Sequence, residues 1–312
     1  MDPVVHIPVL PGEVMRYLAP AAGEIFVDGT IGLGGHALLV AGKLGPSGTL
    51  LGIDLDPSAL AKAGENLSFF RGRLILRQGN YRDLPVFLEE EGLPAPDGIL
   101  LDLGVSSLQL DRGDRGFSYW EDAPLDMRMN PSQNLTAADL VNSASREELS
   151  RIIREYGEEP WAARISQFIV EERKKNPILT THHLVKVIKA AVPAGARRRG
   201  PHPARRTFQA LRIAVNRELE SLETGLMAGI RCLAPGGRMV VISFHSLEDR
   251  LVKQAFQKMA RKCTCPPGFP VCCCGGGPGV EVLTSRPVTP SAEEKEKNPR
   301  SRSAKLRAIR KL

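Results

Sequence analysis

Two groups of residues, at a fixed spacing, could bind a ligand that contains a ribose. The first is a turn with four glycines in seven residues, Gly29 to Gly35, which follows an apolar run ending in Asp28 and precedes a helical pattern. Such a turn presents backbone N–H groups and a helix N-terminus to a ligand, and glycine permits close approach and positive φ. The second is Asp54, 20 residues after Gly34. A carboxylate at this spacing, at the tip of the next strand, can meet a ribose diol.

The turn and the carboxylate together favour an adenosine-type cofactor. NAD and S-adenosylmethionine both fit this pattern. The alternative is structural: Asp54 could instead cap the helix that begins at Pro57. Two more polar positions end predicted strands, Tyr81 after the third and Asp102 at the end of the fourth. The carboxyl ends of parallel strands share one edge of a sheet, so we expect all these residues to converge on one crevice, with Tyr81 suited to cover an adenine.

The elements that must position these residues alternate between apolar strands and helices up to residue 103. This alternation predicts an α/β fold with a parallel sheet covered on both faces. An irregular stretch from Gly113 to about Asn130 follows, and from Thr136 to Val192 only helical periodicities appear, so we expect an all-helical domain inserted into the sheet. We therefore divide the chain into residues 1–112, 113–206 and 207–312: a first part, an insert, and a second part with a basic C-terminal tail. The second part begins with a long helix, 207–233, and its last predicted strand is 280–283.

The composition predicts a folded protein with a polyanionic partner. The net charge of +7 is uneven: residues 186–212 hold eight basic and no acidic residues, and residues 295–312 hold eight basic residues against Glu296. The rest of the chain is therefore acidic. Concentrated basic segments favour nucleic acid as partner, whereas the alternative is a solvated basic surface with a floppy tail. No apolar run approaches the ~20 residues that span a bilayer, and the N-terminus lacks a signal-peptide pattern, so we expect a cytoplasmic protein without membrane contact.

The cysteines form a second candidate site. Two Cys-x-Cys pairs could bind a structural zinc through Cys263, Cys265, Cys272 and Cys274. Their spacing is tighter than that of common zinc knuckles, and free thiols in a loop are the alternative. The sequence is compatible with a homodimer but leaves the oligomeric state open.

Several sequence blocks resemble one known family from end to end of the chain. They match the 16S rRNA (cytosine-N(4))-methyltransferases known as RsmH or MraW, and include Asp28-Gly29-Thr30, Leu101-Asp102-Leu103-Gly104, Pro124-Leu125-Asp126-Met127-Arg128, Ser243-Phe244-His245-Ser246 and Asn298-Pro299-Arg300. The resemblance implies a Rossmann-like class I methyltransferase fold with an inserted helical domain. It implies S-adenosylmethionine as cofactor, and as substrate a cytidine in the decoding region of 16S rRNA in the small ribosomal subunit. The cofactor contacts that it implies are Gly34, Gly35, His36, Asp54, Tyr81, Asp102 and Gln109.

The catalytic group is harder to assign, because the loop after the fourth strand lacks the (Asp/Asn)-Pro-Pro-aromatic tetrapeptide of many amine methyltransferases. A backbone carbonyl of that loop, Asp126 or His245 could accept a hydrogen bond or a proton from the cytosine amine. Asp126 could equally pair with Arg128 or Arg112. A base inside structured RNA must be unstacked, and Phe117 and Trp120 could stack on it while Arg205 and Arg206 hold phosphates. Burial of the aromatic side chains is the alternative.

Three other functions are compatible with parts of the sequence. One is amine methylation of another RNA or of DNA. A nicotinamide-dependent oxidoreductase would also use the glycine turn and Asp54, but neither the helix before the first strand nor the basic segments favour it. A non-catalytic RNA-binding protein would leave the residues at the strand ends unexplained.

Overall fold

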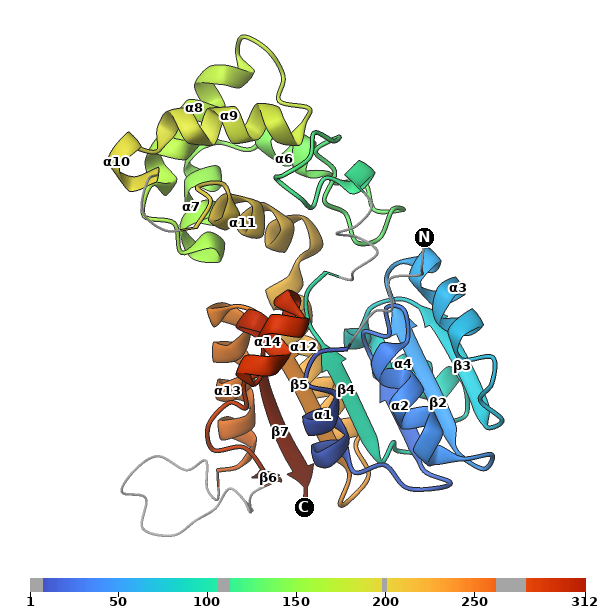
Figure 1. The fold of residues 1–312 in the computed structure, drawn as a ribbon. Coiled ribbons are helices and arrows are strands. Elements are labelled where there is room, and N and C mark those ends of the chain that lie inside the picture. The colour runs from blue at the N-terminus through green and yellow to red at the C-terminus, as the bar shows by residue number, and fades with distance from the viewer. Residues whose placement is uncertain (1–7, 106–112, 198–200, 262–278) are drawn as a thin grey trace. The chain divides into compact units, whose positions relative to one another are not determined.

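The computed structural model describes residues 8–105, 113–197, 201–261 and 279–312. The chain forms two compact units (Figure 1): unit 1 combines Met1–Gly104 with Leu219–Leu312, and unit 2 is Val105–Glu218. Unit 1 therefore comes from both halves of the sequence, and unit 2 is inserted between them. No helix among the described residues is long and apolar enough to cross a membrane.

Unit 1 is built on one sheet of seven strands in the order β3-β2-β1-β4-β5-β7-β6. β1 to β5 are parallel, and β7 is antiparallel to both of its neighbours. The strand bounds are β1 Ile25–Asp28, β2 Thr49–Asp54, β3 Arg73–Gln78, β4 Gly98–Asp102, β5 Arg238–Ser243, β6 Val280–Val282 and β7 Lys305–Lys311. The order reverses between β1 and β4, and open α/β sheets bind their ligands at such a point.

The sheet has an apolar core on each face, because successive strand residues point to opposite sides. Phe26 and Leu50 belong to the core beneath α1 (Pro11–Leu18), α2 (Gly35–Leu44) and α3 (Pro57–Asn66). Val27 and Leu51 belong to the opposite core, beneath α4 (Leu84–Glu90), α12 (Glu218–Cys232) and α13 (Ser246–Met259). The prediction of a parallel sheet covered on both faces is confirmed for these five strands.

Unit 2 consists of helices packed around their own core. α7 (Arg146–Gly157) packs against α8 (Ala162–Arg173) and α11 (Arg205–Asn216), and α8 packs against α9 (Thr181–Ala191). Their inward faces bury aliphatic and aromatic side chains, including Leu149, Ile153, Ile165, Leu184 and Phe208. The remaining elements among the described residues of unit 2 are η2 (Gly113–Arg115), α6 (Ala137–Ser143) and the short α10 (Ala194–Arg197).

The single helix predicted for residues 207–233 is wrong. Arg217 has left-handed backbone angles, φ 49° and ψ 43°, and it separates α11 from α12. α11 packs on α7, where a Cβ at Gly157 would lie 2.6 Å from the carbonyl oxygen of Arg206. The two units therefore divide at Gly104 and Glu218 rather than at the predicted residues 112 and 206. Periodicity missed the break because the apolar pattern continues across it.

The final basic segment is not a tail, and 280–283 does not contain the last strand. Residues 305–311 form β7 between β5 and β6. Leu306 and Ala308 enter one core and Ile309 enters the other, while the buried Arg307 donates from Nε to Oδ1 of Asp249 at 2.7 Å. α14 (Ala292–Lys297) and η3 (Pro299–Ser303) precede this strand. The run of basic residues hid the alternating apolar pattern.

Candidate active site

Strand ends at the reversal point bring together the polar residues of the candidate site. Asp28 ends β1, Asp54 ends β2 and Asp102 ends β4, so three carboxyl groups share the carboxyl edge of neighbouring strands. Gly34 is the N-cap of α2 with φ 83°, and Gly32 has φ 51°. These positive φ angles explain two of the glycines, because side chains rarely adopt this conformation.

Asp28 is buried beside a histidine and two other carboxyl groups. It accepts a hydrogen bond from the Thr30 N–H at 3.2 Å. Burial raises the pKa of Asp28 to about 7, although the neighbouring His36 ring and the Thr30 N–H act in the opposite direction. The charges of Asp102 and Asp54 add to the rise. Excess negative charge at this edge would be relieved by a bound cation.

Asp54 is tied to the backbone by both of its oxygens. Oδ2 accepts from the Gly32 N–H and Oδ1 from the Asp56 N–H, each at 2.9 Å. Burial raises the pKa of Asp54 to about 6 despite these donors. The N-cap of α3 is Asp56, which accepts from the Ser58 N–H, so the alternative that Asp54 caps this helix is wrong. Each oxygen of Asp54 keeps a lone pair for another donor.

His36 and Asp102 have polar atoms that are buried without partners. Nδ1 and Nε2 of His36 and Oδ1 of Asp102 make no hydrogen bond to any described residue. The His36 Nε2 atom lies 3.6 Å from Asp102 Oδ2. The Asp102 N–H donates to the hydroxyl oxygen of Thr30 at 2.6 Å, which joins the end of β4 to the glycine turn. Buried polar atoms without partners are rare in folded proteins and suggest that a ligand completes them.

Tyr81 follows β3 and begins η1 (Tyr81–Asp83). Its ring lies against the backbone of α12, because a Cβ at Gly225 would be 2.4 Å from its Cδ2 atom. A Cβ at Gly29 would lie 3.0 Å from the Tyr81 Cβ, so the glycine turn also contacts this residue. The lack of side chains at Gly225 and Gly29 therefore makes room for the ring and the Cβ of Tyr81, respectively.

These residues fit a cofactor that combines an adenosine with a cationic amino-acid chain. A ribose diol needs acceptors, which Asp54 offers, and an adenine needs an apolar surface, which Tyr81 offers. The amino-acid chain of such a cofactor carries two cations, an ammonium and a sulfonium. The three carboxyl groups and the unpartnered atoms of His36 and Asp102 form a surface that complements this positive charge. The site therefore suits S-adenosylmethionine.

His245 follows β5 and caps the helix that comes next. Its Nδ1 accepts from the Glu248 N–H at 3.4 Å, and its Nε2 lies 3.2 Å from Glu248 Oε1. Glu248 Oε2 in turn accepts from the Phe244 N–H at 2.8 Å. His245 thus forms a capping box at α13. Nε2 of His245 is buried and makes no hydrogen bond to any described residue.

Asp126, in unit 2, pairs with Arg128. Oδ1 accepts from Arg128 Nε at 2.8 Å, and Oδ2 accepts from its guanidinium at 2.7 Å. Partial burial opposes ionisation, but the hydrogen bonds and charge of Arg128 outweigh it and hold the pKa of Asp126 below its ordinary value. The structure thus matches the pairing alternative for this carboxylate.

The predicted RNA-contacting residues differ in exposure. Phe117 is only 9% exposed, as the burial alternative expects, whereas Trp120 is 71% exposed. Tyr119 stacks on His202 with ring centroids 4.7 Å apart, and Trp120 lies 5.2 Å from each of these rings. Arg205 and Arg206 are exposed in the first turn of α11.

Some predicted residues lie outside the described part of the chain: Gln109, Cys263, Cys265, Cys272 and Cys274. Two residues that the structure places at the candidate site, Asp28 and Thr30, were not among the predicted cofactor contacts. The sequence does indicate these positions, because Asp28 ends the first predicted strand and the glycine turn begins directly after it. Their contacts with Asp102 and His36 depend on the neighbouring strand and helix, which the sequence does not show.

The strand order, with β7 antiparallel to its neighbours, defines a class I S-adenosylmethionine-dependent methyltransferase fold. The carboxylates at the point where the strand order reverses agree with this class. The model of the MraW methylase family matches residues 3–312. The chain therefore belongs to the MraW methylase family.

Relatives named ribosomal RNA small subunit methyltransferase H match over nearly their whole length. The protein from Geotalea daltonii is 57% identical over 98% of both chains. The protein from Symbiobacterium thermophilum is 55% identical over 98% of this chain and 96% of its own length. The protein from Trichlorobacter lovleyi is 52% identical over all of both chains. The interpretation as a nicotinamide-dependent oxidoreductase is set aside on these grounds.

Proposed function

We propose that this protein transfers a methyl group from S-adenosylmethionine to the N(4) amine of a cytidine in the decoding region of 16S rRNA. The observation that carries the methyltransferase part is the group of carboxylates at the sheet reversal, where His36 and Asp102 keep buried polar atoms unpartnered. The names of the relatives support the RNA substrate. The choice of cytidine and of N(4) rests on the motifs shared with the RsmH family.

Asp54 would hold the ribose of the cofactor. Its oxygens are fixed by the N–H groups of Gly32 and Asp56, so the carboxylate is oriented before the ligand arrives. Hydrogen bonds from the two ribose hydroxyls would use its remaining lone pairs. Tyr81 would cover the adenine, and the lack of a side chain at Gly225 makes room for its ring.

His36, Asp102 and the turn at Gly34 and Gly35 would face the amino-acid end of the cofactor. Asp28 lies behind them, buried, and its negative charge would stabilise a nearby ammonium. When bound, S-adenosylmethionine supplies a methyl group on a positively charged sulfur. The protein's task is then to hold the cytosine amine in line with that methyl group.

The amine is a weak nucleophile, since its lone pair is delocalised into the ring, and a hydrogen-bond acceptor would orient it. His245 and Asp126 are poorly suited, because the first caps α13 and the second has both oxygens on Arg128. We assign the acceptor to a backbone carbonyl in the loop that follows β4 and begins with Leu103 and Gly104. The proton of the amine would then pass to water.

Unit 2 would bind the RNA. Trp120 offers an exposed ring for stacking, and Arg205 and Arg206 offer guanidinium groups for phosphates. All three belong to unit 2, whereas the residues proposed to bind the cofactor belong to unit 1. The function thus divides between the units.

Methyl transfer from labelled S-adenosylmethionine to small ribosomal subunits that lack the modification tests the proposal. We expect N(4)-methylated cytidine, identified by mass spectrometry, with the wild type. Asp54→Ala removes charged hydrogen bonds of about 1.5–3 kcal/mol, so cofactor affinity should fall roughly 10- to 100-fold. Glu65→Ala, on the exposed surface of α3, is the matched control and should bind the cofactor normally.

Two results would contradict the proposal in different ways. Tight cofactor binding without methylation of subunits or of free 16S rRNA would overturn the substrate. Unchanged cofactor affinity in both Asp54→Ala and Asp102→Ala would overturn the proposed cofactor site.

A further inference from the structure

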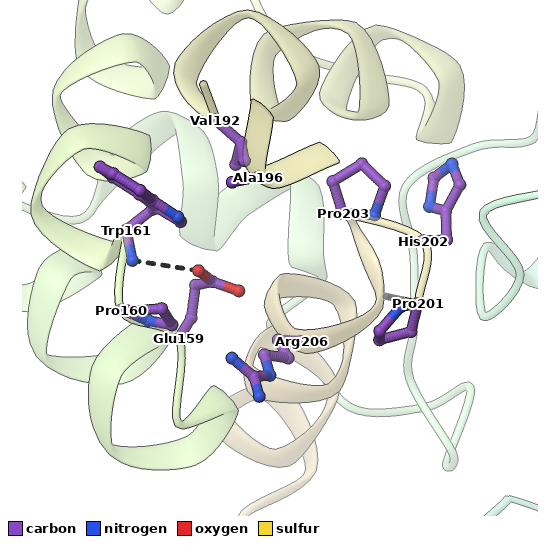
Figure 2. A pocket seen from close by; sticks show the side chains of 9 residues that line it. All are labelled: Glu159, Pro160, Trp161, Val192, Ala196, Pro201, His202, Pro203 and Arg206. Atoms are coloured by element: carbon purple, nitrogen blue, oxygen red, sulfur yellow. Dashed lines mark hydrogen bonds between the residues drawn. The ribbon is translucent and has the colours of Figure 1, made fainter. Parts of the chain in front are cut away.

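Unit 2 contains a cavity of about 240 Å³, and of its lining residues only Arg206 has been given a role above. Figure 2 shows its lining, which comes from the loop between α7 and α8, the end of α9, α10, and the segment that leads into α11. The walls are mostly apolar, with Trp161, Val192, Pro201 and Pro203 among the lining residues. Its size is below the ~300–1,000 Å³ of pockets for drug-sized ligands. A flat fragment such as one nucleobase suits this size.

A buried carboxyl group lies in this cavity. Glu159 is 7% exposed, and its Oε1 accepts from the Trp161 N–H at 3.0 Å. Its Oε2 makes no hydrogen bond or ion pair with any described residue, and Figure 2 shows this oxygen turned toward the space between the lining residues. Oε2 is not among the buried atoms without partners, so it is open to solvent and can be reached by a ligand that enters the cavity. A ligand with N–H donors would bind this oxygen.

The end of α7 presents this carboxyl group. α7 ends at Gly157, and Glu158 follows in the left-handed region with φ 47°. A left-handed residue is a common helix ending, and here it is the C-cap of α7 and comes directly before Glu159. A Cβ at Gly157 would lie 2.6 Å from the Arg206 carbonyl oxygen, so α7 and α11 are in close contact at the cavity.

The other polar groups of the cavity favour a nucleotide over a cationic side chain. Arg206 places a guanidinium at the rim, where a phosphate would bind and a second cation would be repelled. His202 stacks on Tyr119. Its burial, and to a smaller extent the charge of Lys189, hold the pKa of His202 below its ordinary value. The aromatic face of Trp161 provides a stacking surface.

The geometry points to a guanine-binding pocket in unit 2, with Glu159 accepting from the N1–H and N2–H groups of an unpaired guanine in the RNA and Arg206 binding its phosphate. Guanine is the base whose Watson–Crick edge carries two adjacent donors, which match one carboxylate. Cytosine and adenine offer only the amine. This inference rests on the proposed function, because an RNA substrate supplies the guanine.

The fluorescence of Trp161 can report ligand binding in the pocket. The chain has two tryptophans, so Trp120→Phe leaves Trp161 as the only one. We expect guanosine 5′-monophosphate to quench its fluorescence and to bind roughly 10- to 100-fold more tightly than the inosine, adenosine and cytidine nucleotides. Glu159→Gln in this background should abolish the preference, because the amide N–H₂ opposes a donor. Glu155→Gln, exposed on α7 just before the loop that holds Glu159, is the control and should keep it.

A second measurement keeps the test decisive when a free nucleotide binds weakly. Glu159→Gln should raise the KM for ribosomal subunits at least ~10-fold with little change in kcat or in cofactor affinity. The pocket assignment would be overturned if all nucleotides bound equally, or if arginine amide quenched the fluorescence and nucleotides did not. It would also be overturned if the KM were unchanged and no nucleotide quenched the fluorescence. Wild-type methyl transfer to subunits separates the two proposals: transfer without guanine preference overturns only this one, and guanine binding without transfer overturns only the proposed function.

Discussion

Asp54 and Asp56, two positions apart, show how the backbone gives neighbouring carboxyl groups different tasks. Asp56 is buried and caps α3, whereas Asp54 ends β2 and receives N–H groups from the glycine turn and from Asp56. The alternative role predicted for Asp54, capping of α3, belongs to Asp56 in the structure. The choice depends on where β2 ends, and spacing locates that point only to within a residue or two.

Asp28 should make stability depend on pH. Its pKa in the folded protein, about 7, is above the ordinary 3.8, so its contribution to folding is fully present below about pH 4 and is lost as the pH rises to about 7. Asp28→Asn does not titrate. The free energy of unfolding of this variant should therefore rise relative to wild type between pH 4 and 7, by the order of a few kcal/mol.

Urea unfolding at several pH values measures this difference. Asp83→Asn, at a more exposed position, is the control and should run parallel to wild type. Parallel profiles for Asp28→Asn as well would mean that Asp28 titrates normally in the folded protein.

At the scale of elements, most helices and strands could be predicted, because their apolar periods are regular. β7 could not, since Lys305, Arg307 and Arg310 looked like a charged tail until Asp249 and Glu281 provided partners on α13 and β6. The break at Arg217 was also invisible, because a left-handed residue need not be glycine. The sequence placed Asp54, Tyr81 and Asp102 on one edge correctly, but contacts such as Tyr81 with Gly225 arise only between distant segments.

Gly225 in α12 should be needed for the position of Tyr81 rather than for the helix. Alanine in place of glycine within a helix usually stabilises by about 0.5–1 kcal/mol. At Gly225 the added Cβ would lie 2.4 Å from the Tyr81 ring, so the ring must shift. We expect Gly225→Ala to weaken S-adenosylmethionine binding several-fold without raising the melting temperature, as measured by calorimetry.

Gly42→Ala provides the comparison, because its Cβ would enter open space in α2. This variant should gain stability and bind the cofactor normally. Equal behaviour of the two variants would show that the Tyr81 ring has no role in binding.

The Asp249–Arg307 pair should hold β7 to α13. Both side chains are mostly buried, and Asp249→Ala would leave the Arg307 charge without its partner, at a cost of about 3–5 kcal/mol. Glu293→Ala breaks an exposed pair with Lys297 and should cost less than about 1 kcal/mol. Urea unfolding would measure both, and similar small losses in the two variants would contradict a structural role for the buried pair.

At the scale of the whole molecule, the two units separate cofactor binding from RNA binding. Arg205→Ala in unit 2 should lower kcat/KM for ribosomal subunits several-fold and reduce the salt slope of RNA binding by about 0.7–0.9. S-adenosylmethionine affinity should not change. Lys62→Ala, in unit 1 and paired with Glu65, should alter none of these quantities. An unchanged salt slope in Arg205→Ala would remove this side chain from the RNA contacts.

The interrupted sheet also has a consequence for how the chain reaches its native state. β4 pairs with β5, and Asp102 lies opposite Ile242, 140 positions later. Closing so long a loop is entropically costly, and non-local pairing slows folding. If unit 2 collapses first around its local helix contacts, the effective loop becomes much shorter. The slow phase of refolding should therefore report the joining of β4 to β5, and substitutions confined to the core of unit 2 should lengthen it.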